Sequence, residues 1–109
     1  MADVDEGAAA EITLSTRVDP GGARVVSVAG ELDSSNAQML ADTMATLLAE
    51  RPERVIFELG ALRFMDSAGI AVLVRTAADV ETVEIRDPSP IVRRVIEVTG
   101  LTHVLRIAS

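Results

Sequence analysis

The sequence predicts one α/β domain with a mixed, mostly parallel sheet packed with helices, in the order β-β-α-β-α-β-α-β. Two strand-like segments near the start flank a turn sequence, Asp19-Pro20-Gly21-Gly22, which is typical of an antiparallel hairpin. Apolar residues then recur alternately at helical spacing and in short strand-like runs, and right-handed crossovers between such strands make a sheet mostly parallel. A length of 109 residues fits a single core.

In the first half of the chain, period-two alternation predicts strands over residues 11–18 and 24–29, with the second strand ended by Gly30-Glu31-Leu32-Asp33. An apolar face from Ala37 to Leu48 predicts a helix that ends near Glu50, because Pro52 disfavours helical geometry at the preceding residue. Its candidate N-caps are Asp33, Ser34 and Ser35. The near-unbroken apolar run within residues 54–59 predicts a third strand, covered on both faces.

The second half predicts two helices and two strands. The helical stripe of Ile70, Leu73, Val74 and Ala77 predicts a helix from residue 67 to about 79, followed by a strand over residues 80–86. Ser89 as N-cap and Pro90 at the first helical position start the third helix, and Gly100 is expected just after its end with Leu101 supplying the accompanying contact. A last strand contains Val104, Leu105 and Ile107, with His103 at its beginning in a structural role.

Composition excludes several classes of function. Ten basic and seventeen acidic residues give a formal net charge of −7, which argues against binding to nucleic acid or anionic lipid and favours a protein partner. The absence of cysteine excludes disulfides and thiol catalysis. Neither paired metal-ligand spacings nor a glycine-rich phosphate loop occurs, so we expect no metal, cofactor or enzymatic activity.

The first ten residues are acidic and lack both a basic start and a long apolar run, which indicates a disordered tail rather than a signal peptide. No segment approaches the roughly 20 apolar residues of a membrane span. We therefore expect a disordered tail over residues 1–10, one domain over residues 11–109, and a cytoplasmic location.

Ser67 lies at the start of the predicted second helix, after the predicted third strand, in the stretch Phe64-Met65-Asp66-Ser67-Ala68-Gly69-Ile70. A helix N-terminus has unpaired N–H groups and the positive end of the helix dipole, so it favours negative charge. A serine hydroxyl there is able to cap the helix, and a phosphate on it would meet a ready anion site. Position alone leaves Ser67 open as a helix cap or as a phosphorylation site. Asp66 is either a turn residue or a group that orients the Ser67 hydroxyl or repels a partner once Ser67 carries phosphate.

Four motifs together resemble the STAS domain of bacterial anti-sigma factor antagonists, over residues 11–107. They are Gly30-Glu31-Leu32-Asp33, the stretch from Phe64 to Ile70, Pro88-Ser89-Pro90 and Thr99-Gly100-Leu101. The resemblance implies that Ser67 is phosphorylated by an anti-sigma factor that is itself a serine kinase. It further implies that the unphosphorylated protein binds this kinase and frees the sigma factor. The phosphorylated protein would not bind, and a serine phosphatase acting on phospho-Ser67 would restore the unphosphorylated form.

The resemblance also implies that Asp33 and the start of the first helix lie beside Ser67. The expected partner surface comprises Asp33, Ser34, Ser35, Asn36, Met65, Asp66, Ser67, Ala68 and Gly69. Within it, Met65 is the expected exposed anchor, and Ala68 and Gly69 would let a partner backbone approach closely. Two other functions remain open: a STAS scaffold or ligand sensor that does not depend on phosphorylation, and a serine hydrolase using Ser67 and His103, which lacks the Gly-x-Ser-x-Gly elbow.

Overall fold

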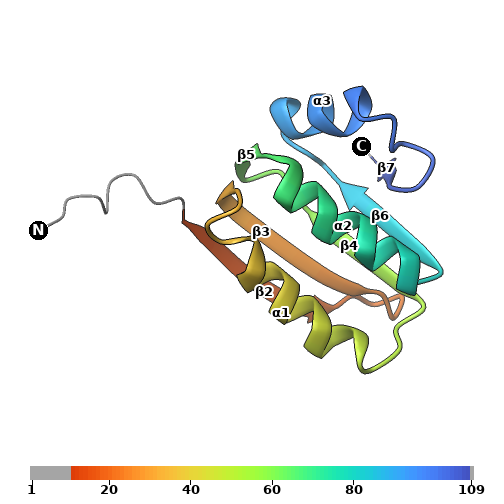
Figure 1. Ribbon diagram of the computed structural model, residues 1–109. Helices are drawn as coiled ribbons and strands as arrows, with labels where there is room; N and C mark the ends of the chain where they lie inside the picture. Colours follow the sequence, from red (N-terminus) through yellow and green to blue (C-terminus); the bar gives the residue numbers. More distant parts are fainter. Residues whose placement is uncertain (1–10, 109) are drawn as a thin grey trace, which may run out of the picture.

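The computed structural model describes residues 11–108, so the predicted acidic tail over residues 1–10 lies outside the described residues. Figure 1 shows the elements in space. In chain order they are β2 (Ile12–Val18), β3 (Arg24–Leu32), α1 (Ala37–Leu48), β4 (Arg54–Glu58), β5 (Leu62–Met65), α2 (Ser67–Asp79), β6 (Thr82–Arg86), α3 (Pro90–Val98) and β7 (Arg106–Ala108). None of the helices in residues 11–108 is long and apolar enough to span a membrane.

The six strands form one sheet. Five of them follow the order β2-β3-β4-β6-β7, and the sixth, β5, pairs with β3. β2 is antiparallel to β3, whereas all other strand pairs are parallel. In the turn of the β2–β3 hairpin, the Asp19 carboxylate accepts hydrogen bonds of 3.0 Å from the N–H groups of Gly21 and Ala23. The predicted hairpin and the mixed, mostly parallel sheet are therefore confirmed.

β5 is a sixth strand that the sequence prediction missed, because no strand was expected between residue 59 and the helix that begins at residue 67. Its two end residues are buried and its two middle residues exposed, so it lacks the alternation by which a strand is recognised. β3 also continues to Leu32 instead of ending at Ala29. It pairs with β4 up to Ser27 and with β5 from Gly30, and its register with β5 shifts between Gly30 and Glu31. Gly30 has a φ of +106°, and a Cβ there would lie 2.2 Å from the backbone oxygen of Glu11. The irregular backbone of β3 at this position therefore requires glycine.

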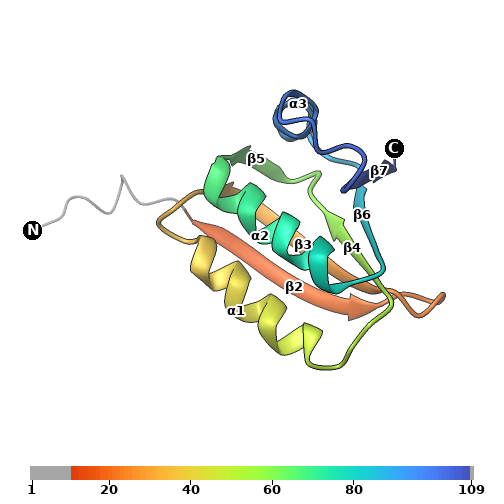
Figure 2. The same ribbon diagram turned by 45° about the vertical axis from the view of Figure 1, so that its right-hand side comes forward.

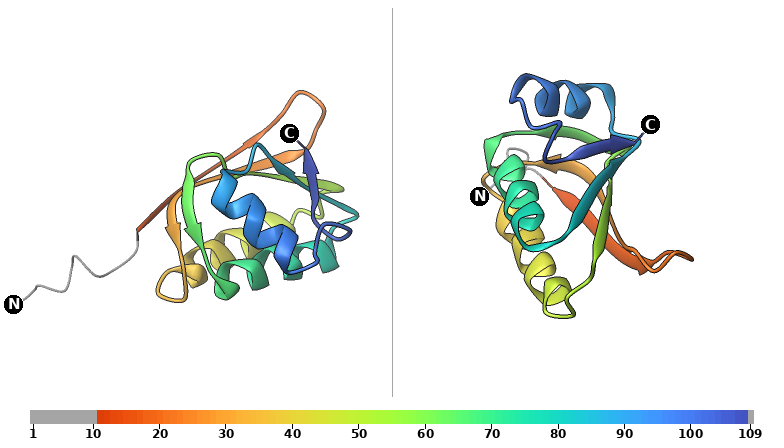
Figure 3. Two further views of the ribbon diagram at one scale, coloured as in Figure 1. Left: turned by 90° about the horizontal axis from the view of Figure 1, so that it is seen from above. Right: turned by 90° about the vertical axis from the view of Figure 1, so that its right-hand side faces the viewer.

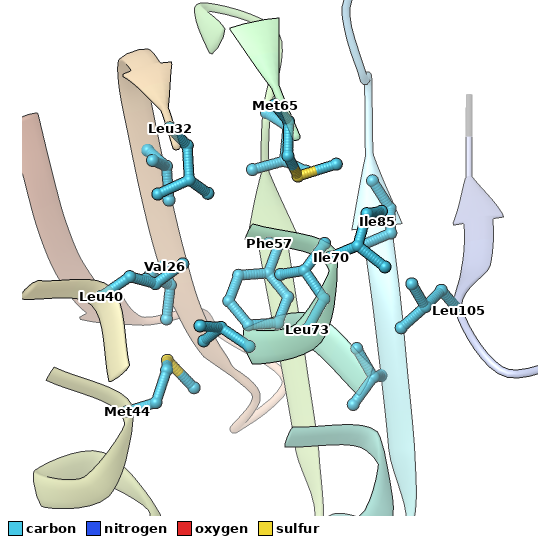
Figure 4. Packing of buried hydrophobic residues seen from close by; sticks show 14 of the residues in the cluster. Val26, Leu32, Leu40, Met44, Phe57, Met65, Ile70, Leu73, Ile85 and Leu105 are labelled. Atoms are coloured by element: carbon cyan, nitrogen blue, oxygen red, sulfur yellow. The ribbon is translucent and has the colours of Figure 1, made fainter. Parts of the chain in front are cut away.

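α1 and α2 lie side by side on one face of the sheet, as Figures 1 and 2 show, and α3 lies at the end of the sheet near β5 (Figure 3). Each strand sends alternate side chains towards the helices, which is why Val26, Phe57 and Ile85 fall in one core cluster. Phe57 lies at the centre of this cluster between Ile70 and Leu73 of α2 (Figure 4) and is fully buried. Burying a side chain of this size contributes about 2–3 kcal/mol.

The ends of α3 follow the predicted pattern. Ser89 is its N-cap residue and Pro90 its first helical residue, although the Ser89 hydroxyl donates to the Leu62 carbonyl at 2.6 Å instead of capping the helix. After the helix, Gly100 has a φ of +75°, and the N–H groups of Gly100 and Leu101 donate to Glu97 and Ile96. This pair of hydrogen bonds is the Schellman motif, so the predicted end of the helix at a glycine is confirmed.

His103 does not begin the last strand, contrary to the prediction. Residues 102–104 form a turn in which the N–H groups of Val104 and Leu105 donate to the Leu101 carbonyl, and β7 begins only at Arg106. His103 is exposed in this turn. Leu105 is fully buried and docks the turn onto the core.

The face of the sheet opposite α1 and α2 carries a row of polar side chains. Strand register aligns Ser15 with Ser27, Ser27 with Glu58, and Glu58 with Arg86. The Glu58 carboxylate accepts two hydrogen bonds from the Arg17 guanidinium, at 2.8 and 3.1 Å, and one from the Ser27 hydroxyl at 2.7 Å. These bonds, led by those from Arg17, lower the pKa of Glu58 to about 2.

This network predicts a pH-dependent contribution to stability. Because the folded-state pKa of Glu58 is below its ordinary value of 4.5, its contribution is present above about pH 4.5 and is lost as the pH falls towards 2. We expect Glu58→Gln to lower the free energy of unfolding at pH 7 by about 1 kcal/mol, a modest value because the partner Arg17 is half exposed. Urea titrations at pH 7, 5 and 3 should show the gap between variant and wild type closing on acidification.

Glu81→Gln is the matched control, since Glu81 is exposed and makes no ion pair within residues 11–108. A gap for Glu58→Gln that stays constant from pH 7 to pH 3 would contradict the assignment of this contribution to the ionised carboxylate.

Candidate functional site

The ends of β3 and β5 bring two predicted site segments together. Leu32, the last residue of β3, is in register with Met65, the last residue of β5. Asp33 and Asp66 follow these residues directly, and the Asp66 N–H donates to the Leu32 carbonyl at 3.2 Å. The loop before α1 and the start of α2 are therefore neighbours, as the resemblance implied.

Asp66, and not Ser67, caps α2. Asp66 has an extended backbone conformation, and its carboxylate accepts a hydrogen bond of 2.9 Å from the Ala68 N–H, while its carbonyl accepts one of 3.1 Å from Ile70. Ser67 is thus the first residue of the helix, is exposed, and makes no side-chain hydrogen bond to any residue of the described chain. Of the two roles that the sequence left open for Ser67, capping is therefore performed by Asp66 instead, because the carboxylate one residue earlier already accepts from the Ala68 N–H group.

The loop from Asp33 to Asn36 is held by the side chains of Asp33 and Asn36, which form hydrogen bonds within the loop and to the end of β3. The Asp33 carboxylate accepts from the N–H of Ser35 at 2.8 Å and from its hydroxyl at 2.6 Å, and these bonds lower the pKa of Asp33 below its ordinary value. The Asn36 amide accepts from the Asp33 N–H at 3.0 Å and donates to the Glu31 carbonyl at 2.8 Å. These contacts fix the loop next to Ser67.

The predicted N-caps of α1 need correction. The N-cap position is Asn36, and its side chain makes no capping hydrogen bond because it is already bonded to residues 31 and 33. Asp33 contributes its backbone carbonyl, which accepts from the N–H groups of Asn36 at 3.2 Å and Ala37 at 2.9 Å. Neither Ser34 nor Ser35 caps the helix.

The nine predicted site residues divide by exposure. Ser34, Ser35 and Ser67 are exposed, Asp33, Asp66 and Ala68 are partly buried, and Asn36, Met65 and Gly69 are buried. The expectation of Met65 as an exposed anchor is wrong: it is 2% exposed and points into the core beside Leu32 (Figure 4). As the last residue of a strand that packs under α2, Met65 fills space between the sheet and the helix.

Gly69 also has a different role from the predicted one. A Cβ at Gly69 would lie 2.7 Å from both Leu32 Cδ2 and Met65 Cγ. The missing side chain therefore lets α2 approach the ends of β3 and β5, and it leaves no free surface for a partner backbone.

Sequence reasoning did not select two exposed apolar side chains on the elements that carry this site. Met39, in the first turn of α1, is 53% exposed, and Phe64, in β5, is 43% exposed. A signal for Met39 was present, since it falls off the stripe of buried residues Ala37, Leu40 and Met44. For Phe64 the signal depended on recognising β5, where it neighbours the buried Met65.

The electrostatic character of this end of the molecule is acidic. Asp33 and Asp66 flank Ser67 without an ion pair in residues 11–108, and the nearby Glu31 is paired with Arg63 at 3.4 Å. Within the same residues, no hydrogen bond links Ser67 to His103, and no cluster of side chains suited to a metal ion occurs. The arrangement offers an accessible hydroxyl at a helix N-terminus between two carboxylates.

This geometry predicts that negative charge on Ser67 spares the fold. Charge in the first turn of a helix is favourable by about 0.3–1 kcal/mol, and here the neighbouring carboxylates offset part of that gain. We expect Ser67→Asp to change the free energy of unfolding by less than about 1 kcal/mol. Matching circular dichroism spectra and urea midpoints for variant and wild type would support this, and a collapsed spectrum would show that α2 does not begin here.

The family model of the STAS domain matches residues 14–109, which include every element from β3 to β7 and most of β2. The chain belongs to the STAS family. This STAS domain is 28% identical over 97 residues to the anti-sigma-F factor antagonist RsfB of Mycobacterium tuberculosis, with 86% of this chain and 80% of that protein covered. It is 27% identical over 92 residues to the putative anti-sigma factor antagonist BtrV of Bordetella bronchiseptica, with coverage of 81% and 79%.

Solved structures share the fold. An anti-sigma factor antagonist from Mycobacterium paratuberculosis superposes on the STAS domain with a TM-score of 0.82 and 29% identity, covering 89% of this chain and 85% of that one. The unphosphorylated form of the anti-sigma factor antagonist SpoIIAA superposes with a TM-score of 0.75 and 22% identity, covering 89% of both chains. At that identity SpoIIAA supports the fold alone, and it agrees with the predicted STAS architecture.

Proposed function

We propose that this STAS domain is an anti-sigma factor antagonist of the cytoplasm, switched by phosphorylation of Ser67. The unphosphorylated form binds an anti-sigma factor of the serine kinase type and thereby frees the sigma factor. The kinase transfers a phosphate to Ser67, which ends binding, and a serine phosphatase restores the active form.

The observation that carries this proposal is the state of the Ser67 hydroxyl. It is exposed at the first position of α2, and Asp66 performs the capping that would otherwise occupy it. A kinase therefore reaches this hydroxyl without unwinding the helix. The names of the relatives at 27–29% identity, all antagonists of anti-sigma factors, support the same class of partner.

The negative charges of Asp33 and Asp66 around Ser67 explain why the phosphorylated form would not bind the partner. A phosphate brings a charge of about −1.5 to −2 at pH 7. The helix N-terminus tolerates this charge in the free protein. A partner that covers Ser67 would instead bury the phosphate beside Asp33 and Asp66, and an uncompensated buried charge costs several kcal/mol. Phosphorylation is thus expected to abolish binding and to leave the fold intact.

The direct test is incubation of the protein with candidate anti-sigma kinases and ATP, followed by mass spectrometric location of the phosphate. We expect one phosphate on Ser67 and none on Ser67→Ala. Ser35→Ala is the matched control, because Ser35 is exposed in the adjacent loop, and it should still accept one phosphate. Phosphate on Ser34 or Ser35, or none from a kinase that the domain binds, would favour a scaffold that does not depend on Ser67 phosphorylation.

A further inference from the structure

A pocket separate from the Ser67 site lies on the sheet face opposite α1 and α2. This pocket has a volume of about 370 Å³, at the small end of the range for ligand sites. It extends from the outward hydroxyls of β2 and β3 to Arg86 at the end of β6, with the turn between β4 and β5 as a further wall. Ser67 begins a helix on the other face, so this pocket is independent of the proposed switch.

Arg86 is the one cationic residue among those that line this pocket. Its guanidinium forms an ion pair with the Glu58 carboxylate at 3.6 Å, a separation too long for a hydrogen bond. The hydrogen bonds that Glu58 accepts come from Arg17 and Ser27. No other residue of the described chain accepts a hydrogen bond from the Arg86 side chain. Its side chain is 35% exposed, so its N–H groups are available to a molecule in the pocket.

The remaining lining combines hydroxyls with small apolar groups. Thr13, Ser15 and Ser27 present hydroxyls from two paired strands, and Ala29 contributes a methyl group on the same face. A guanidinium binds a carboxylate or phosphate group through two parallel hydrogen bonds. The hydroxyls of Thr13 and Ser15 supply further donors, whereas the Ser27 hydroxyl already donates to Glu58. The apolar patch suits a short hydrocarbon body.

We propose that this pocket binds a small organic anion, with its charged group on Arg86 and its apolar body against Ala29 and the β4–β5 turn. Two carboxylates face the same space and oppose the anion. Glu58 is compensated by the bidentate pair with Arg17, and Asp87 is exposed at the rim, where water screens it. Together with the net charge of −7, these carboxylates repel the anion, so we expect weak binding.

The test is a titration of the full-length protein, labelled with 15N, with benzoate, phenyl phosphate and the neutral benzyl alcohol at one constant ionic strength. We expect saturable shifts of the backbone amides of Ser27, Ala29, Ala61 and Arg86 with at least one anion, in the millimolar range, and at least about tenfold weaker binding of benzyl alcohol. The two anions distinguish a carboxylate from a phosphate ligand. No saturable shift with either anion, or equal binding of benzyl alcohol, would overturn the proposal.

Three variants locate the site. Arg86→Gln should weaken the binding by about tenfold or more, and Ala29→Leu should block it by filling the pocket. Arg75→Gln changes the net charge equally on α2, across the sheet, where Arg75 is exposed, and should bind as the wild type does. Undiminished binding by Ala29→Leu, or an equal loss in Arg75→Gln, would refute this pocket as the site.

Discussion

Ser67→Ala is expected to bind an anti-sigma kinase equally tightly with ADP and with ATP, and to release the sigma factor constitutively. The variant keeps a small uncharged surface at the start of α2 and has no hydroxyl to phosphorylate. Phosphorylated wild type should bind about a thousandfold more weakly, which corresponds to a penalty of about 4 kcal/mol. Asp33 and Asp66 contribute to this penalty because neither carries a compensating ion pair in residues 11–108.

Titration of wild type, Ser67→Ala and Ser67→Glu against one kinase partner, first with ADP and then with ATP, measures this effect. Wild type should lose affinity with time in ATP, Ser67→Ala should not, and Ser67→Glu should bind weakly under both conditions. Equal affinity of all three proteins with both nucleotides would refute the phosphorylation switch while leaving the fold and the family unaffected.

Gly69→Leu is expected to lower the free energy of unfolding by about 3 kcal/mol, a value at the upper end for overpacking a core. Even a Cβ at this position would lie 2.7 Å from atoms of Leu32 and Met65, and both of these side chains are buried. The effect opposes intrinsic propensity, because replacing a helical glycine normally stabilises an exposed helix by about 0.5–1 kcal/mol. Weaker partner binding by this variant should therefore be accompanied by a lower free energy of unfolding.

Urea unfolding of Gly69→Leu and of Ala78→Leu makes the comparison, since Ala78 lies in the same helix with its side chain exposed. Ala78→Leu should change the free energy of unfolding by less than about 0.5 kcal/mol. If Gly69→Leu unfolded at the same urea concentration as wild type and only its partner affinity fell, Gly69 would belong to the interface after all.

Local sequence pattern was sufficient to predict most helices and strands, but it was insufficient to predict which residue caps α2 at the Ser67 site. The hairpin turn at Asp19, the stop of α3 at Gly100 and the three helices depend on neighbours within a few residues, and the structure has them all. By contrast, the sequence does not reveal whether Asp66 or Ser67 caps α2, because both residue types are good caps. The ψ of −167° at Asp66 directs its carboxylate to the Ala68 N–H, and that backbone angle is set where Asp66 bonds to Leu32.

The sequence by itself determined the alternation of strands and helices, the apolar faces that form the core, and the resemblance that identifies Ser67. Only the tertiary structure decided that β3 changes partner at Gly30 to pair with β5, and that Met65 and Gly69 are therefore buried beneath α2. It also decided that Ser15, Ser27, Glu58 and Arg86 share one row of an open face. The physical reason is that periodicity records which side of an element is buried, whereas strand pairing joins residues up to 33 positions apart, such as Leu32 and Met65. No local pattern encodes such contacts.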